Sequence, residues 1–140
     1  MFLPNGTWLQ PPGFVHQMIS ETMQPNGLEV SITNSSLSAN LTASAQQSDD
    51  GKTLVVRLAN VGKRAVTLSL NVSGAARLGG DDAVDATMWL LASPSGDPLD
   101  ANTPAEPERV RPVKRAIKAT ADITLPAASA AVVVLGQPSA

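Results

Sequence analysis

Alternation of apolar and polar residues recurs through the first half of this 140-residue chain. Apolar side chains occupy every second position over 28–33, and the same spacing returns over 41–46, 53–60 and 65–72. A period of two places one set of side chains on a buried face and the other in solvent, which is typical of a half-buried β-strand. Gly51 lies in a turn between two of these segments, where a positive φ is wanted. The succession predicts an antiparallel β-meander whose register the alternation fixes.

Three more strands are expected in the second half. Residues 86–91 are apolar on both faces, as in a central strand, and strands are also expected over 117–125 and 130–135. A long loop over 93–112, rich in Pro, Asp and Asn, precedes the last two, and loops of this length pack on something or serve a function. With about seven or eight short strands, we expect an all-β fold, a jelly-roll-like antiparallel β-sandwich.

One helix precedes the strands. Pro11-Pro12 fixes the backbone of a first helical turn, and Pro25-Asn26-Gly27 ends the pattern. The apolar residues between them recur at helical spacing and include Phe14, Val15, Met18 and Ile19. An amphipathic helix of this kind needs a surface to lie on. We divide the chain into a leading segment with the helix (1–27), a β-sandwich (28–136) and a short tail (137–140).

Composition excludes several classes of protein. Apolar residues make up 43% of the chain and charged residues 16%, so a buried core is expected and disorder is not. A net charge of -2 gives no electrostatic reason to expect nucleic acid or an anionic membrane surface as a partner. No apolar run reaches membrane-spanning length, and the first residues lack the pattern of a signal peptide, as in a chain begun inside a longer protein.

No catalytic, cofactor or metal site is expected. Cysteine is absent, and the one histidine, His16, lies on the polar side of the helix with no second ligand of its kind. Glycoside hydrolysis needs two carboxylates at a fixed separation. The four glutamates (Glu21, Glu29, Glu106 and Glu108) fall at polar positions or in the long loop, away from the apolar surroundings that would raise the pKa of a general acid.

A binding surface is considered on aromatic and charged residues. Trp8 is the candidate aromatic platform for a sugar ring, although it could equally pack under the helix, and Trp89 is expected in the core. Half of the basic residues fall within 109–118, where they could meet an acidic polysaccharide or form a mixed charged surface or a docking face. Four N-glycosylation sequons fit a secreted glycoprotein, or arise by chance in a chain rich in Ser, Thr and Asn: Asn5, Asn34, Asn40 and Asn71.

The order of four segments resembles the C-terminal part of α-L-arabinofuranosidases of glycoside hydrolase family 51. Residues 12–20 (PGFVHQMIS) resemble the last barrel helix of that family, and 54–61 (LVVRLANV) an early strand of its C-terminal sandwich. The loop 102–112 (NTPAEPERVRP) and the phrase 125–129 (LPAAS) are similar to the family's Asn-to-Pro loop and its closing phrase. Each phrase alone is weak, but their order and spacing agree over about residues 8–136.

The resemblance implies a place beside a catalytic domain. In the family a (β/α)8 barrel hydrolyses terminal non-reducing α-L-arabinofuranosyl groups of arabinan and arabinoxylan with retention, through two glutamates on barrel strands. No residue here matches either glutamate motif, and 140 residues cannot contain a barrel of roughly 250. The chain alone is therefore expected to be an inactive C-terminal domain that supports a barrel, with Phe14, Val15, Met18 and Ile19 as docking residues left exposed in its absence.

Two alternatives remain open from the sequence. One is a free-standing carbohydrate-binding module with an exposed Trp8 and a plant-type polysaccharide as ligand. The other is an extracellular adhesion sandwich of the immunoglobulin or fibronectin type, which the helix and the long Pro-rich loop disfavour. As part of a longer secreted protein involved in arabinose metabolism, the chain would be extracellular or in the cell wall.

Overall fold

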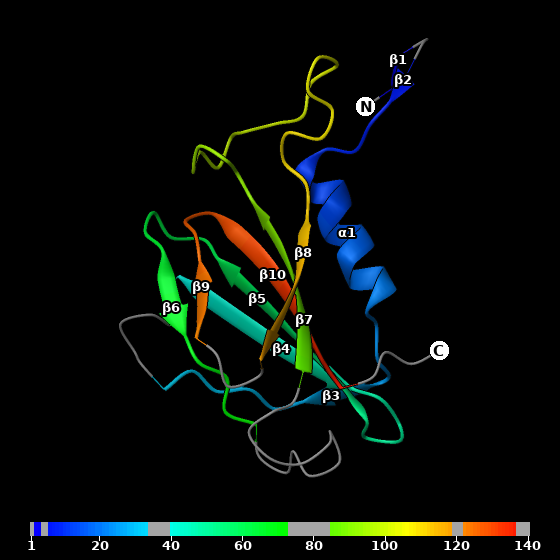
Figure 1. Cartoon of the computed structure of the whole chain (residues 1–140), viewed down its shortest axis with the longest axis vertical. Helices are drawn as coiled ribbons and strands as arrows, with labels where there is room; N and C mark the ends of the chain where they lie inside the picture. Colours follow the sequence, from blue (N-terminus) through cyan, green and yellow to red (C-terminus); the bar gives the residue numbers. More distant parts are fainter. Residues whose placement is uncertain (1, 4–5, 34–39, 73–84, 119–121, 137–140) are drawn as a thin grey trace.

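The main sheet has six strands and lies between a helix and a smaller sheet (Figure 1). The computed structural model describes residues 2–3, 6–33, 40–72, 85–118 and 122–136. Its elements in chain order are β1 (Phe2–Leu3), β2 (Gly6–Thr7), α1 (Pro11–Glu21), β3 (Asn26–Leu28), β4 (Leu41–Gln47), β5 (Thr53–Asn60), β6 (Val66–Leu68), β7 (Asp85–Ala92), β8 (Val113–Lys118), β9 (Ile123–Leu125) and β10 (Ser129–Gly136).

Every strand pairing in the main sheet is antiparallel. The order is β3-β4-β5-β10-β7-β8, so that the last strand of the chain lies at the centre, between β5 and β7. β6 and β9 pair with each other in the smaller sheet, and β1 and β2 form a separate two-stranded hairpin. The all-β sandwich expected from the sequence is confirmed, while a jelly-roll connection remains a prediction.

Residues on the two faces of the main sheet belong to two separate apolar clusters. The inner cluster joins Val56, Met88 and Val133 of the main sheet to Ile123 and Leu125 of β9. The outer cluster contains other residues of the same strands, which pack against Met18 of α1: Val55, Leu91 and Val132, with Trp89 and Val134 at its margin. Because successive side chains of a strand point to opposite faces, strands covered on both sides must be apolar throughout. This explains the continuous apolar runs in β7 and β10.

Four predicted strands agree closely with the structure, and so does the helix. The segments 41–46, 53–60, 86–91 and 130–135 correspond to β4, β5, β7 and β10. β7 has a neighbour on each side, as expected of a central strand. Gly51 has a φ of 73° in the turn between β4 and β5, which confirms the left-handed backbone predicted there.

Three other predicted strands are wrong in extent. The segment predicted over 28–33 contributes only Leu28 to β3, and the segment over 65–72 forms only the three residues of β6. β6 also leaves the predicted meander, because it pairs with β9 in the other sheet. The strand predicted over 117–125 is two strands in different sheets, β8 and β9. The alternation identified extended chain correctly, but it carries no information on which sheet a segment joins.

Candidate functional site

The helix uses its apolar face within the sandwich. Met18 is 2% exposed and packs in the outer cluster, with Phe14 and Val15 partly buried beside it. The expectation that this face stays exposed without a barrel is therefore wrong for Met18, because β7 and β10 of this chain cover it. Ile19 is also partly buried. Docking of these four residues onto a barrel is untested.

A groove runs along α1 on the side of β4 and β5. Its helix wall consists of Val15, Met18 and Ile19, and its volume is about 260 Å³. The floor is the outer face of the main sheet, where the side chains are small: Thr42 and Ser44 of β4, Ala59 of β5 and Ala130 of β10. Short side chains leave the sheet surface low beside the helix. The groove is therefore lined by aliphatic and small side chains and is open to solvent.

Arg57 is the charged residue in the wall of this groove. Its Nη1 donates to Oε1 of Gln46 at 2.8 Å, and its Nη2 donates to the carbonyl oxygen of Thr22 at 3.0 Å. Thr22 follows the last residue of α1, so Arg57 fastens the C-terminal end of the helix to the sheet, where a cation is favourable. None of the ion pairs among the described residues includes Arg57, and its buried Nε has no hydrogen-bond partner there. Burial lowers the pKa of its guanidinium below the ordinary value.

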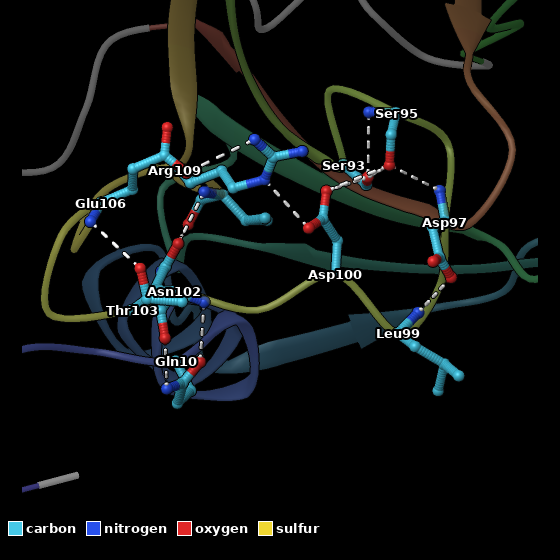
Figure 2. A network of polar contacts seen from close by, with 11 residues as sticks. Gln10, Ser93, Ser95, Asp97, Leu99, Asp100, Asn102, Thr103, Glu106 and Arg109 are labelled. Atoms are coloured by element: carbon cyan, nitrogen blue, oxygen red, sulfur yellow. Dashed lines mark hydrogen bonds and ion pairs between the residues drawn. The ribbon is translucent and has the colours of Figure 1, made fainter.

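The long loop 93–112 is tied to the start of the helix through Asn102 (Figure 2). Asn102 is 3% exposed, and its Nδ2 donates to the carbonyl oxygens of Leu9 and Val110 at 2.8 and 2.9 Å. Gln10 completes the junction, because its side-chain amide pairs with the main chain of Asn102 in both directions, at 2.9 and 3.0 Å. The loop therefore packs on the segment that leads into α1, in agreement with the expectation that a loop of this length packs on something.

A second network holds the outer part of the loop (Figure 2). The carboxylate of Asp100 accepts hydrogen bonds from Nε of Arg109 at 3.0 Å and from the hydroxyls of Ser93 and Ser95 at 2.7 and 3.2 Å. The Arg109 guanidinium first, and then the Ser93 hydroxyl, lower the pKa of Asp100 from 3.8 to about 2. Leu99 beside it is 86% exposed. These bonds give the loop a fixed shape around an exposed leucine.

The two tryptophans are engaged within the chain. Trp8 is partly buried and its Nε1 donates to the carbonyl oxygen of Asn102 at 3.2 Å, so it belongs to the same junction as Gln10. Trp89 lies on the outer face of β7, in partial contact with the outer cluster rather than in the inner core. Nζ of Lys114 lies 5.1 Å from its ring centroid, within cation–π distance. Whether Trp8 contacts a sugar is untested.

The basic segment 109–118 is largely a mixed charged surface. Arg109 pairs with Asp100 and Glu106, Arg111 with Glu108, and Lys118 with Asp85. Pairing of three of the five cations with neighbouring carboxylates matches the mixed surface considered from the sequence. Exposed pairs of this kind contribute little to stability.

The remaining polar candidates lie at the surface. His16 and all four glutamates are exposed, and no group of three or more His, Asp or Glu residues suited to a metal occurs in the described part of the chain. Of the sequons, Asn40 and Asn71 are exposed, whereas Asn5 and Asn34 lie outside the described residues. α1, the one helix of the described ranges, is too short to cross a membrane.

Solved structures with the same fold include arabinofuranosidases of family 51. The arabinose-bound MgGH51 α-L-arabinofuranosidase matches 96% of this chain with a TM-score of 0.78 and 17% identity. The thermostable enzyme from Thermotoga petrophila matches 94% with a TM-score of 0.72 and 21% identity. The sequence matches no protein-family model, and no curated protein is significantly similar to it. The resemblance expected from the sequence is thus confirmed at the level of fold.

The matched region is a fraction of each larger chain. This chain spans 20% of the MgGH51 structure and 30% of the Thermotoga structure. A similar sandwich also occurs in BuGH86, solved in complex with neoagarooctaose, with a TM-score of 0.53, 19% identity and coverage of 79% of this chain and 15% of that one. The fold is therefore found as a part of larger proteins of more than one family.

Proposed function

We propose that this chain is the non-catalytic C-terminal β-sandwich of an α-L-arabinofuranosidase and supports a catalytic (β/α)8 barrel in the same polypeptide. The observation that carries the proposal is the fold likeness, which takes in 96% of this chain but 20% of the MgGH51 enzyme. The helix is included in so complete a match, and this argues against a chance likeness between two sandwiches.

The positions of the glutamates favour a structural role over a catalytic one. A retaining glycosidase needs two carboxyl groups about 5–5.5 Å apart, one of them with a raised pKa. The four glutamates are exposed, and Glu106 and Glu108 face arginines in ion pairs. Under the proposal the parent enzyme releases terminal non-reducing α-L-arabinofuranosyl groups from arabinan or arabinoxylan, and its acid/base and nucleophile lie in the barrel.

The domain would act on the barrel by packing beside it and covering its apolar surface. If the parent is secreted, the place of action is outside the cell or in the cell wall. The use of Asn40 and Asn71 as glycosylation sites would follow from such an origin, and both are exposed as an acceptor must be. A free carbohydrate-binding module is less favoured, because Trp8 already donates to Asn102 and is partly buried.

The experiment measures the native mass and the activity together. An antibody raised against this chain is used to purify the native polypeptide, whose hydrolysis of p-nitrophenyl α-L-arabinofuranoside is compared with that of the isolated chain. We expect the native polypeptide to be heavier than the 14.4 kDa of this chain by at least the mass of a barrel of roughly 250 residues. The native polypeptide should hydrolyse the substrate, and the isolated chain should not. A native mass near 14.4 kDa would refute the proposal.

A further inference from the structure

The groove between α1 and strands β4 and β5 has the features of an unfilled protein interface. Its helix wall is aliphatic, and its floor of Thr42, Ser44, Ala59 and Ala130 is lower than a surface of long side chains would be. α1 lies mainly over β7 and β10 and reaches β5 at Val55, whereas Thr42 and Ser44 of β4 are exposed on this face. A segment bound in this groove would contact both the helix and the sheet.

The charge in the wall indicates what such a segment carries. Arg57 is the cation of the groove, and the partners it has are neutral oxygens of Gln46 and Thr22. Its Nε, unpaired within the described residues, is buried, so a group from outside would bind the second N–H of Nη1, whose one hydrogen bond among these residues is to Gln46. The described residues include no carboxylate in an ion pair with Arg57. A guanidinium offers five N–H donors and is completed best by a carboxylate. The surroundings of Arg57 are therefore complementary to an acidic side chain from outside this chain.

We propose that this groove docks a segment of the catalytic domain that carries an aspartate or glutamate, whose carboxylate pairs with Arg57. This inference rests on the proposed function, because it takes the occupant from the missing domain of the same polypeptide. A sugar fits the groove less well, since its lining is mainly aliphatic and offers no aromatic face.

The test measures how accessible the groove is with and without the rest of the polypeptide. The chain has no cysteine, so Ser44→Cys introduces a single thiol within this domain at an exposed floor position. Its alkylation rate is followed by mass spectrometry of the peptide that contains it, in the isolated chain and in the native-length polypeptide. We expect the rate to fall about tenfold or more in the longer protein. Ala116→Cys, at an exposed position of β8 outside the groove, is the matched control.

Two further variants separate charge from shape. In the longer protein, Arg57→Gln should raise the alkylation rate of Ser44→Cys toward that of the isolated chain, and Arg57→Lys should raise it less. Arg57 also holds Thr22, so a loosened helix could mimic this result. Ala59→Leu fills the floor without touching that contact and should raise the rate in the same way, while Ala116→Leu should not.

The outcomes distinguish this inference from the proposed function. Equal alkylation of Ser44→Cys in the isolated chain and in a longer protein with arabinofuranosidase activity would overturn the docking site and leave the proposed function intact. Absence of any longer polypeptide would overturn both. A mass of the isolated chain near twice 14.4 kDa, reduced to one copy by Ala59→Leu, would overturn the proposed occupant and assign the groove to a second copy of this chain.

Discussion

Asn102 and Val110 bond to each other through the Asn102 side chain as two strand residues do through their main chains. Nδ2 of Asn102 donates to the carbonyl oxygen of Val110 at 2.9 Å, and the Val110 amide donates to Oδ1 of Asn102 at 2.7 Å. Both residues are buried, at 3% and 4% exposed. The pair closes the segment between them into a compact unit and leaves Asn102 free to reach Leu9 with its second amide hydrogen.

Replacement of Asn102 by alanine should destabilise the chain by about 2–4 kcal/mol, because the buried main-chain groups of Val110 and the part-buried carbonyl of Leu9 lose their partners. Denaturant unfolding of the purified variant measures this loss. Asn26→Ala is the matched control, since Asn26 is exposed and its bonds to Gln47 and Asp49 lie at the surface. An Asn102→Ala variant as stable as the Asn26→Ala variant would contradict the role of Asn102 as the anchor of the loop.

Stability should fall in strong acid partly through Asp100, whose pKa is lowered from 3.8 to about 2. A carboxyl group with a lowered folded-state pKa contributes stability above its unfolded pKa, and loses it as pH falls through the folded one. Between about pH 4 and pH 2, the free energy of unfolding of Asp100→Asn should therefore change less than that of the wild type. Asn26→Ala removes no titratable group and should keep the wild-type slope. Parallel curves for wild type and Asp100→Asn would exclude this contribution.

How far the sequence predicts the fold is clear from β5 and β6. β5 was predicted to the residue, since its alternation lies between a Gly51 turn and a Gly62 turn. The prediction for β6 is five residues too long, because alternation shows which side of a segment is buried and not whether the segment pairs with another strand. Leu70 and Val72 pack on the inner cluster but lie outside β6. Between β8 and β9 neither glycine nor proline occurs, so nothing in the sequence marks the change of sheet.

The candidate site was predictable only in part. The length and composition of the loop containing Asn102, and its likeness to a family motif, single it out in the sequence. Its partners are not predictable in this way, because Gln10 and Trp8, which donate to the main-chain carbonyl of Asn102, lie 92 and 94 residues away. Met18 was expected at an apolar helix face, and it lies there. For Met18 the cover comes from the main sheet of this chain, which the sequence did not predict, since helical spacing identifies an apolar side and not its neighbour.

Met18→Ala should cost about 2–5 kcal/mol, because it opens a cavity between α1 and the main sheet in the outer cluster. Met23→Ala is a control of the same chemistry: Met23 is 56% exposed, so we expect a change of about 0.5 kcal/mol or less. Thermal and denaturant unfolding of both variants give the comparison. Similar small losses in both would mean that the helix does not pack on the sheet in solution.

Ala128→Gly should stabilise the chain by about 0.5–1 kcal/mol. Ala128 has a φ of 50° in the link between β9 and β10, a left-handed conformation that disfavours a residue with a Cβ atom. Its amide donates to the carbonyl oxygen of Gly62 at 3.2 Å, so the link is held against the β5–β6 turn and the strained conformation is kept. Relief of that strain outweighs the extra freedom that glycine gives the unfolded chain. Ala127→Gly, beside it and without a positive φ, gains no such relief and should destabilise by about the same amount. Denaturant midpoints of the two variants should therefore move in opposite directions, and a shift of both to lower stability would show that Ala128 is not strained in solution.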